Sequence, residues 1–295
     1  MALYSIKDLE RISNQKAHTI RIWEQRYGLL VPERTETNIR FYDDQQLRKL
    51  LNVCTLMDKG MKISHISKLS KPEMDIEIDK IIAASFQSDE HTEVIITQAM
   101  ISLTTYDEAL FNELFEMSVT KFGLIKTYEK IVYPLLVRTG LMWIKDDLLP
   151  TQEHFLSNLI KQKLFSATDS LPLPKNPDQT WILFLNEDED HEIGLLFANY
   201  VIKYYGKKVV YLGQKVPYNN LSNVVAQCKP THIYTFFVRN QYSDQLSELL
   251  ANLLANFGDT TTICVSGANK SVEKLARDKQ VISIKTIEQL LEMIS

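Results

Sequence analysis

Hydrophobic and polar positions follow three different patterns in succession along the chain. Residues 1–72 combine short stretches of helical spacing with one stretch, residues 31–42, that alternates around a polar turn. Residues 75–170 repeat the i, i+3, i+4, i+7 spacing of amphipathic helices. Residues 178–295 alternate short apolar runs with helical stretches. The pattern therefore predicts three domains with these boundaries, of which the second is a four-helix bundle.

The last domain has the pattern of a doubly wound α/β fold. Its five apolar runs, each followed by a helical stretch, cover residues 180–186, 208–213, 232–238, 261–267 and 280–284. Strands that alternate with helices form a parallel sheet with right-handed crossovers. Ligands of such Rossmann-like sheets bind at the carboxyl ends of the strands. Chemistry is therefore expected in the loops that follow these runs.

The first domain has the pattern of a helix-turn-helix followed by a small hairpin, the wing. Ser5 is placed to cap the first helix, and Gly28 ends the second. The second helix of such a motif enters the major groove of DNA. Candidates for contact with DNA on this helix and on the wing are Lys16, His18, Thr19, Arg21, Arg26, Tyr27, Arg34, Arg40 and Tyr42. The pattern alone leaves open a generic four-helix domain whose arginines only face solvent.

The distribution of charge favours a polyanionic partner for the first domain. The whole chain has 33 Lys and Arg against 37 Asp and Glu, a net charge of −4. Residues 1–70 carry 12 Lys and Arg against 8 Asp and Glu, which leaves 21 against 29 for the remainder. No apolar run approaches the roughly 20 residues that cross a bilayer. Because the sequence also lacks a secretion signal and scatters its three cysteines, we expect a cytoplasmic protein.

The stretch TIRIWEQRYGLLVPERTETNIRFYD, residues 19–43, resembles the MerR family of transcription regulators in order, spacing and residue type. The resemblance implies a winged helix that binds double-stranded operator DNA. The residues that it places nearest base edges are Arg21, Thr19 and His18, and those that it places at phosphates are Arg26, Arg40 and Tyr42. Thr37-Asn38 stand where the family usually has Gly-Gly, which implies a locally different wing.

A charged loop, DEDHEIG at residues 188–194, follows the first predicted strand. The acids alone are typical of a solvated helix N-terminus. Glu189, His191 and Gly194, however, have the acidic-x-His-x-x-Gly spacing of cobalamin-binding domains, which this loop resembles. The resemblance implies that His191 is the lower axial ligand of cobalt and that Glu189 fixes the imidazole tautomer. It also implies that Gly194 lets the corrin ring approach the helix.

A second signature lies in the helical domain, where nine residues separate Trp143 from the pair Glu153 and His154. This resembles the helices of CarH/LitR-type MerR regulators in which Trp, Glu and His cover the upper face of adenosylcobalamin. Taken alone, Trp143 is more typical of a core aromatic in a bundle, and Glu153 and His154 are typical of an exposed polar pair. Photoreceptor members have a histidine directly after the tryptophan. Ile144 stands there and cannot ligate a metal, so a light-driven bis-histidine adduct through that position is not expected.

The same resemblance implies further cofactor contacts at Leu212, Gly213, Thr235 and Gly267. Three positions depart from the family pattern. Phe236 and Phe237 add bulk where the nucleotide tail of cobalamin passes, and Ser266 replaces the first glycine of a pair. Overfilling a close-packed site costs about 1–3 kcal/mol. These departures therefore predict weakened or lost cofactor binding.

Together these features favour a DNA-binding regulator, in the first place a repressor, that senses adenosylcobalamin and converts its binding into a change of homo-oligomer, dimer or tetramer. A second hypothesis keeps DNA binding and makes the sheet a cobalamin-independent module for dimerisation or for docking a protein antagonist. The third hypothesis is an enzyme, but 295 residues leave no room for a catalytic barrel beside a winged helix. We predict no enzymatic activity.

Overall fold

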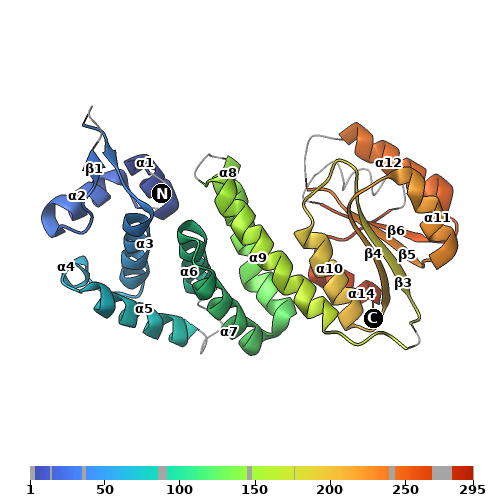
Figure 1. Cartoon of the computed structure of the whole chain (residues 1–295), viewed down its shortest axis with the longest axis horizontal. Coiled ribbons are helices and arrows are strands. Elements are labelled where there is room, and N and C mark those ends of the chain that lie inside the picture. The colour runs from blue at the N-terminus through green and yellow to red at the C-terminus, as the bar shows by residue number, and fades with distance from the viewer. Residues whose placement is uncertain are drawn as a thin grey trace. The chain divides into compact units, whose positions relative to one another are not determined.

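The structure is a computed structural model of the 295-residue chain. It describes all residues except 1–3, 14, 35–37, 86–91, 145–147, 176, 239–242, 268–280 and 295. The chain forms two compact units, Met1–Leu159 and Ile160–Ser295, and each is described by itself (Figure 1). None of the described helices is long and apolar enough to cross a membrane.

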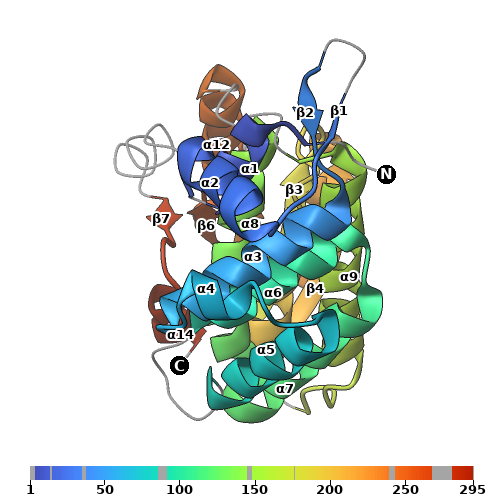
Figure 2. The ribbon, with the colours of Figure 1, turned by 90° about the vertical axis from the view of Figure 1, so that its left-hand side faces the viewer.

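The first unit begins with the predicted winged helix-turn-helix. Its elements are α1 (Ile6–Ser13), α2 (Ala17–Tyr27), the antiparallel strands β1 (Glu33–Arg34) and β2 (Arg40–Phe41), α3 (Asp44–Asp58) and α4 (Ile63–Ile66). Helix α1 packs against α2 and α3. The two strands project from the unit as a wing (Figure 2). The pattern of apolar positions therefore predicted these elements in the right order.

Local hydrogen bonds explain where these helices begin and end. The Oγ of Ser5 accepts from the backbone N–H of Asp8 at 3.3 Å, and the Asp8 carboxylate accepts from the N–H of Ser5 at 2.6 Å. Gly28 has the left-handed φ of 59° that ends α2, a conformation that glycine adopts without strain. Asp43 caps α3 by accepting from the N–H of Gln46 at 2.8 Å.

Longer helices fill the middle of the chain. They are α5 (Lys71–Ser85), α6 (Thr92–Thr105), α7 (Glu108–Thr127), the π-helical turn η1 (Tyr128–Val132), α8 (Tyr133–Ile144) and α9 (Pro150–Asp169). Helix α6 is buried along most of its length and contacts α3, α5, α7 and α8. The spacing over residues 75–170 predicted regular helices throughout. The structure instead widens into a π turn just before Pro134, which has no N–H for a regular helical hydrogen bond.

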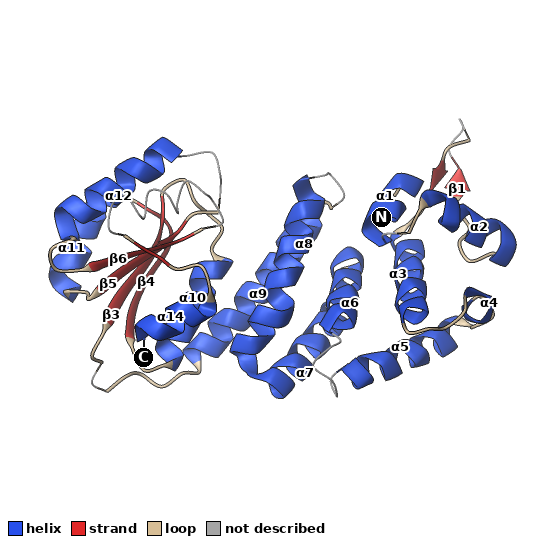
Figure 3. Ribbon diagram, turned by 180° about the vertical axis from the view of Figure 1, so that it is seen from behind, coloured by secondary structure: helices blue, strands red, loops and turns tan. Residues whose placement is uncertain are grey.

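The second unit contains the predicted five-stranded parallel sheet, in the order β4-β3-β5-β6-β7. Its strands are β3 (Thr180–Asn186), β4 (Lys208–Val216), β5 (His232–Phe236), β6 (Thr262–Ser266) and β7 (Ile282–Ser283). Its described helices are α10 (Ile193–Tyr204), α11 (Tyr218–Cys228), α12 (Ser243–Phe257) and α14 (Ile287–Ile294). Helices α10 and α14 cover one face of the sheet, and α11 and α12 cover the other (Figure 3). The helix predicted over residues 271–279 lies outside the described residues.

Alternate residues of the strands face the two helical layers. One face builds an apolar core with α11 and α12, and its strand residues include Ile182, Phe184, Ile233, Ile263 and Val265. The opposite face packs against α10, whose residues from Leu195 to Ile202 are all buried. Because β3 and α10 are both buried, the loop that joins them is held rigidly at its two ends.

Candidate functional site

The loop between β3 and α10, residues 187–192, lies at the carboxyl end of the sheet. Strand β3 is flanked by β4 on one side and by β5 on the other, so the strand order reverses here. Crevices at such reversal points are where open α/β sheets bind ligands. The predicted cluster of acids and His191 therefore stands at the expected place in the fold.

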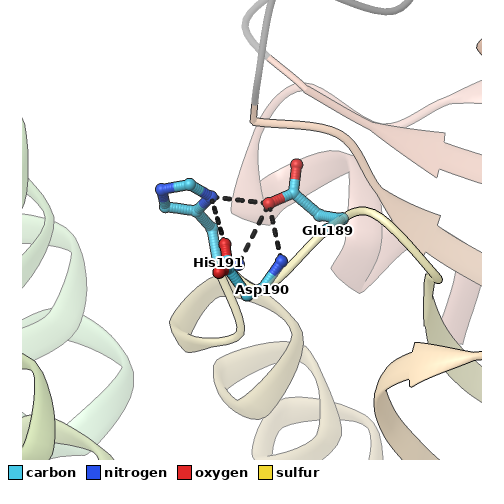
Figure 4. Close-up of side chains that lie close together, drawn as sticks. All are labelled: Glu189, Asp190 and His191. Carbon is cyan, nitrogen blue, oxygen red and sulfur yellow. Dashed lines mark hydrogen bonds and ion pairs between the residues drawn. The ribbon is translucent and has the colours of Figure 1, made fainter.

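Glu189 organises this loop from a buried position. Its Oε1 accepts from the backbone N–H groups of Asp190 and His191, both at 3.0 Å, and lies 2.5 Å from Nδ1 of the His191 ring (Figure 4). Its Oε2 accepts from the N–H of Val238 at 2.9 Å. The side chain of Glu189 is 6% exposed, whereas that of His191 is 47% exposed. Glu189 thus connects the loop after β3 to the chain after β5.

The contact with Glu189 defines what the His191 ring can do. A carboxylate only accepts hydrogen bonds, so Nδ1 carries a hydrogen, and in the neutral ring the lone pair is on Nε2. Nε2 points away from Glu189 in Figure 4. A histidine held in this way by a carboxylate is the arrangement that metal-ligating histidines use. Asp190 adds a second carboxylate 3.5 Å from Nδ1, so one acidic group is buried and one is at the surface.

Glu192 is a buried acid of the same loop that the sequence analysis did not assign. The hydroxyl of Tyr211 donates to its Oε1 at 2.9 Å, and Nζ of Lys161 lies 3.4 Å from its Oε2. Burial and the neighbouring carboxylate raise the pKa of Tyr211, which therefore stays protonated as a donor. The only signal in the sequence was a fifth acid in the loop. Its burial and partners depend on the packing of α9 and β4.

Gly194 and Phe236 lie in direct contact. A Cβ at position 194 would stand 3.0 Å from the ring atom Cε1 of Phe236, so the missing side chain of the glycine makes room for this ring. Gly267 has a similar role, since a Cβ there would come within 2.3 Å of the Phe237 carbonyl oxygen. Of the three predicted cofactor glycines, Gly194 thus lies against the Phe236 ring and Gly267 against the backbone of Phe237.

Thr235 does not take part in the contact between Phe236 and Gly194. Thr235 is in register with Phe184 and Val265, which belong to the core beneath α11 and α12. Phe236, the next residue, faces α10. The hydroxyl of Thr235 is buried without a hydrogen-bond partner among the described residues. Of the other predicted contacts, Leu212 packs against the same core and Gly213 has a left-handed φ of 77°.

The predicted capping residues belong to the first unit. Trp143 lies in α8, and its side chain is outside the described residues. Glu153 and His154 lie in the first turn of α9, where Nδ1 of His154 is 2.9 Å from Oε2 of Glu153. The His154 side chain is largely exposed. Beside them, the unpredicted Gln152 is fully buried and donates to the carbonyl of Thr104 at 3.1 Å, which fixes the start of the helix.

The predicted DNA-contacting residues divide into exposed and buried ones. The exposed side chains are those of Lys16, His18, Arg21, Arg26 and Arg34, while Thr19 and Tyr27 are partly buried. The guanidinium of Arg26 lies 5.6 Å from the centre of the Tyr27 ring, and that of Arg34 donates to Oδ1 of Asn38 at 2.6 Å. Tyr42 is fully buried. This placement differs from the predicted phosphate contact, because a side chain without exposed surface cannot reach DNA.

Comparison with known proteins assigns the N-terminal domain to a family. Residues 4–71 match the model of the MerR HTH family regulatory proteins. The chain therefore contains a MerR-type helix-turn-helix domain. The predicted resemblance to the MerR family is thereby confirmed for residues 4–71.

Several HTH-type transcriptional regulators resemble the chain. The HTH-type transcriptional repressor CarH of Myxococcus xanthus is 26% identical over 268 residues, which are 90% of this chain and 89% of that protein. CarA of the same organism, also an HTH-type transcriptional repressor, is 25% identical over 84% of this chain and 81% of its own length. The regulator MlrA of Escherichia coli K12 is 31% identical over 78 residues, 26% of this chain and 32% of that protein.

A solved structure resembles the part of this MerR-type regulator that contains the sheet. The monomethylamine corrinoid protein of Methanosarcina barkeri superposes with a TM-score of 0.53 at 16% identity and covers 68% of this chain and 93% of its own. At this identity the likeness concerns the fold. It confirms the predicted fold, a helical region followed by a Rossmann-like sheet.

Within the MerR domain, Glu24 is a further residue that the sequence analysis did not assign. Its carboxylate accepts a hydrogen bond from the Tyr42 hydroxyl, and its Oε2 lies 3.4 Å from Nε of Arg40. The side chain of Glu24 is 6% exposed. The recognition helix α2 is therefore joined to the end of the wing by a buried acid. The spacing of 16 residues between Glu24 and Arg40 gave no signal of this pair.

Proposed function

We propose that this MerR-type regulator is a repressor whose C-terminal sheet binds cobalamin, with adenosylcobalamin as the physiological form. The observation that carries the proposal is the His191 ring, which a buried Glu189 holds through Nδ1 and which is 47% exposed at the reversal point of a parallel sheet. Cobalamin, when bound, supplies a cobalt centre with one axial position for a protein ligand. His191 is the proposed lower ligand.

The residues present fit this group at the axial position and not at its nucleotide tail. The partly exposed His191 and the buried Glu189 have the burial, tautomer and geometry that a cobalt ligand needs. The contact of Phe236 with Gly194 closes the space beside α10 that a buried tail would use. The proposal therefore assigns binding to the corrin ring and its axial ligand. Trp143, Glu153 and His154 stay proposed contacts of the upper face.

For DNA, we propose that α2 enters the major groove. Arg21, Thr19 and His18 read base edges, because they stand on the N-terminal half of this helix. Arg26 and Arg40 contact phosphates and set affinity without reading sequence. Tyr42 is left out of this set, since its hydroxyl donates to Glu24 in the interior of the domain.

The proposed link between the two activities is a change of assembly. A ligand that binds one assembly more tightly than another shifts the equilibrium toward it by mass action. An assembly with several winged helices multiplies DNA contacts and raises affinity through effective concentration. Cobalamin would in this way control operator occupancy.

Visible absorbance tests the cobalamin proposal directly. The full chain is mixed with adenosylcobalamin in the dark and separated from free cofactor by gel filtration. We expect the corrin absorbance to travel with the wild-type protein and with His65→Ala, a control that removes an exposed histidine of α4. It should be lost with His191→Ala. Absence of absorbance from the wild-type protein would reject cobalamin binding and leave the DNA-binding function intact.

A further inference from the structure

An aromatic row lines the face of the sheet that is covered by α10. His232, Tyr234 and Phe236 alternate along β5 and so point to the same side. The His232 ring stacks on Trp181 with centroids 4.0 Å apart, and the centroids of Tyr234 and Phe236 are 4.8 Å apart. The row ends at Phe236, whose ring occupies the space that Gly194 leaves open. The side of α10 nearest to His191 is therefore filled by aromatic side chains.

A hydrogen-bonded chain fixes this row at its inner side. The hydroxyls of Tyr234 and Ser266 are 2.6 Å apart, and the Ser266 hydroxyl donates to the carbonyl of Ile284 at 2.5 Å. Both side chains are buried. The Ser266 hydroxyl therefore donates its only hydrogen to a backbone carbonyl and accepts the hydrogen of the Tyr234 hydroxyl. The Ser266 hydroxyl thus stabilises the fold, and its hydrogen is not available to a ligand.

The ligating side of the site has the opposite character. The His191 ring is held by Glu189, which also accepts from the N–H of Val238, two residues beyond Phe236. A corrin ring needs access to Nε2 of His191. A nucleotide tail that is to be buried needs, in addition, a slot between α10 and the sheet. The His191 side chain is 47% exposed, whereas the Phe236 ring fills the space beside Gly194 between α10 and the sheet.

We propose that this site selects its ligand by the corrin ring and the axial histidine and does not read the nucleotide tail. The ligand class is corrinoids with or without a lower nucleotide, including cobinamides. This inference rests on the proposed function of His191. Its physical basis is that a tail left in solvent adds no buried surface, so its removal forfeits no affinity. A site with an open slot would bury the tail and bind the complete cofactor more tightly.

The test compares adenosylcobalamin with adenosylcobinamide, which differ only in the nucleotide tail. Dissociation constants are measured by visible titration of the full wild-type chain in the dark. We expect the two values to agree within about threefold, or adenosylcobinamide to bind more tightly. Wild-type preference for adenosylcobalamin by more than about tenfold would overturn the inference while supporting the cobalamin proposal. Failure of both ligands to bind would instead reject the proposed function itself.

Variants test whether Phe236 is the reason. Phe236→Ala should open the slot and shift the ratio of the two affinities at least about tenfold toward adenosylcobalamin. Phe237→Ala is the matched control, because it removes the same ring from the side that packs on the core beneath α11 and α12. It should leave the ratio unchanged. An equal shift in both variants would overturn the role of Phe236. Phe236→Leu replaces the alanine variant if the latter does not fold, and a lower melting temperature of the apo protein confirms that the ring is packed.

Discussion

The hydroxyl of Tyr42 donates a hydrogen bond to the carboxylate of Glu24, which joins the end of the wing to the recognition helix inside the MerR domain. The Glu24 carboxylate also pairs with Arg40, so this buried acid contacts both the buried Tyr42 hydroxyl and the partly exposed Arg40. Burial, followed by the neighbouring carboxylate, raises the pKa of Tyr42, which remains a donor at neutral pH. The position of the wing relative to α2 is therefore set by this acid.

Tyr42→Phe should lower the stability of the MerR domain. The substitution keeps the buried ring and removes one donor from a carboxylate that is almost without solvent, which costs about 1–3 kcal/mol. Thermal unfolding followed by circular dichroism measures the loss. Tyr27→Phe is the control, since Tyr27 is only partly buried in the same domain. Equal melting temperatures for wild type and Tyr42→Phe would show that the hydrogen bond contributes nothing.

Arg40→Ala and Arg21→Ala should affect DNA binding in different ways. Arg40→Ala should lose a phosphate contact, which weakens binding to all sequences alike and lowers the slope of log affinity against log salt concentration by about 1. Arg21→Ala should lose a base contact, which relaxes sequence preference. Gel shifts on matched and scrambled sites at several salt concentrations distinguish the two. Lys49→Ala, an exposed charge removed from α3, controls for net charge. Uniform weakening by Arg21→Ala, with altered preference in Arg40→Ala, would reverse the assignment.

Glu189→Gln should weaken corrinoid binding without removing the ligand itself. The amide cannot stabilise His191 as the carboxylate does, and changes of such supporting groups typically lower metal affinity about 10–100-fold. The visible titration with adenosylcobalamin measures the effect. Asp190→Asn, in the same loop but at the surface, should change the affinity much less. A larger effect of Asp190→Asn would make Asp190 the supporting group.

The C-terminal unit should lose stability in mild acid through His232. Burial lowers the pKa of His232 below its ordinary value of 6.5. As the pH falls, His232 is therefore protonated in the unfolded chain before it is protonated in the folded chain. The contribution of neutral His232 to the free energy of unfolding is complete above pH 6.5 and is lost as the pH falls toward the lower pKa of the folded state. Phe at this position keeps the stack on Trp181 and cannot titrate. Urea unfolding at about pH 7.5 and about pH 5.5 should show a smaller loss for His232→Phe than for wild type.

The three cysteines should differ in reactivity. Burial raises the pKa of Cys54 and of Cys264 to about 12 in each case, so neither forms thiolate at neutral pH. Cys228 is partly buried at the end of α11. A thiol reagent should label one cysteine quickly in the native protein and all three in denaturant. Cys228→Ser should abolish the fast reaction, and rapid labelling of that variant would contradict the described packing.

Local sequence determined the elements of this protein and their order. The cap formed by Ser5 and Asp8, the left-handed Gly28 and the alternation of strands with helices depend on neighbours within a few residues, and periodicity reports such neighbours. The acidic-x-His spacing likewise predicted the contact of Glu189 with His191, because both residues lie in one short loop. The MerR resemblance could be read for the same reason from one continuous stretch.

Tertiary structure alone decided which of these residues face a ligand. The pairing of Glu24 with Tyr42 and of Lys161 with Glu192, and the contact of Phe236 with Gly194, join positions 18 to 42 residues apart. Strand register turned Thr235 toward the core and Phe236 toward α10, and a shift by one residue would exchange the two. Spacing along the chain contains no record of such contacts, since they depend on how separate elements pack.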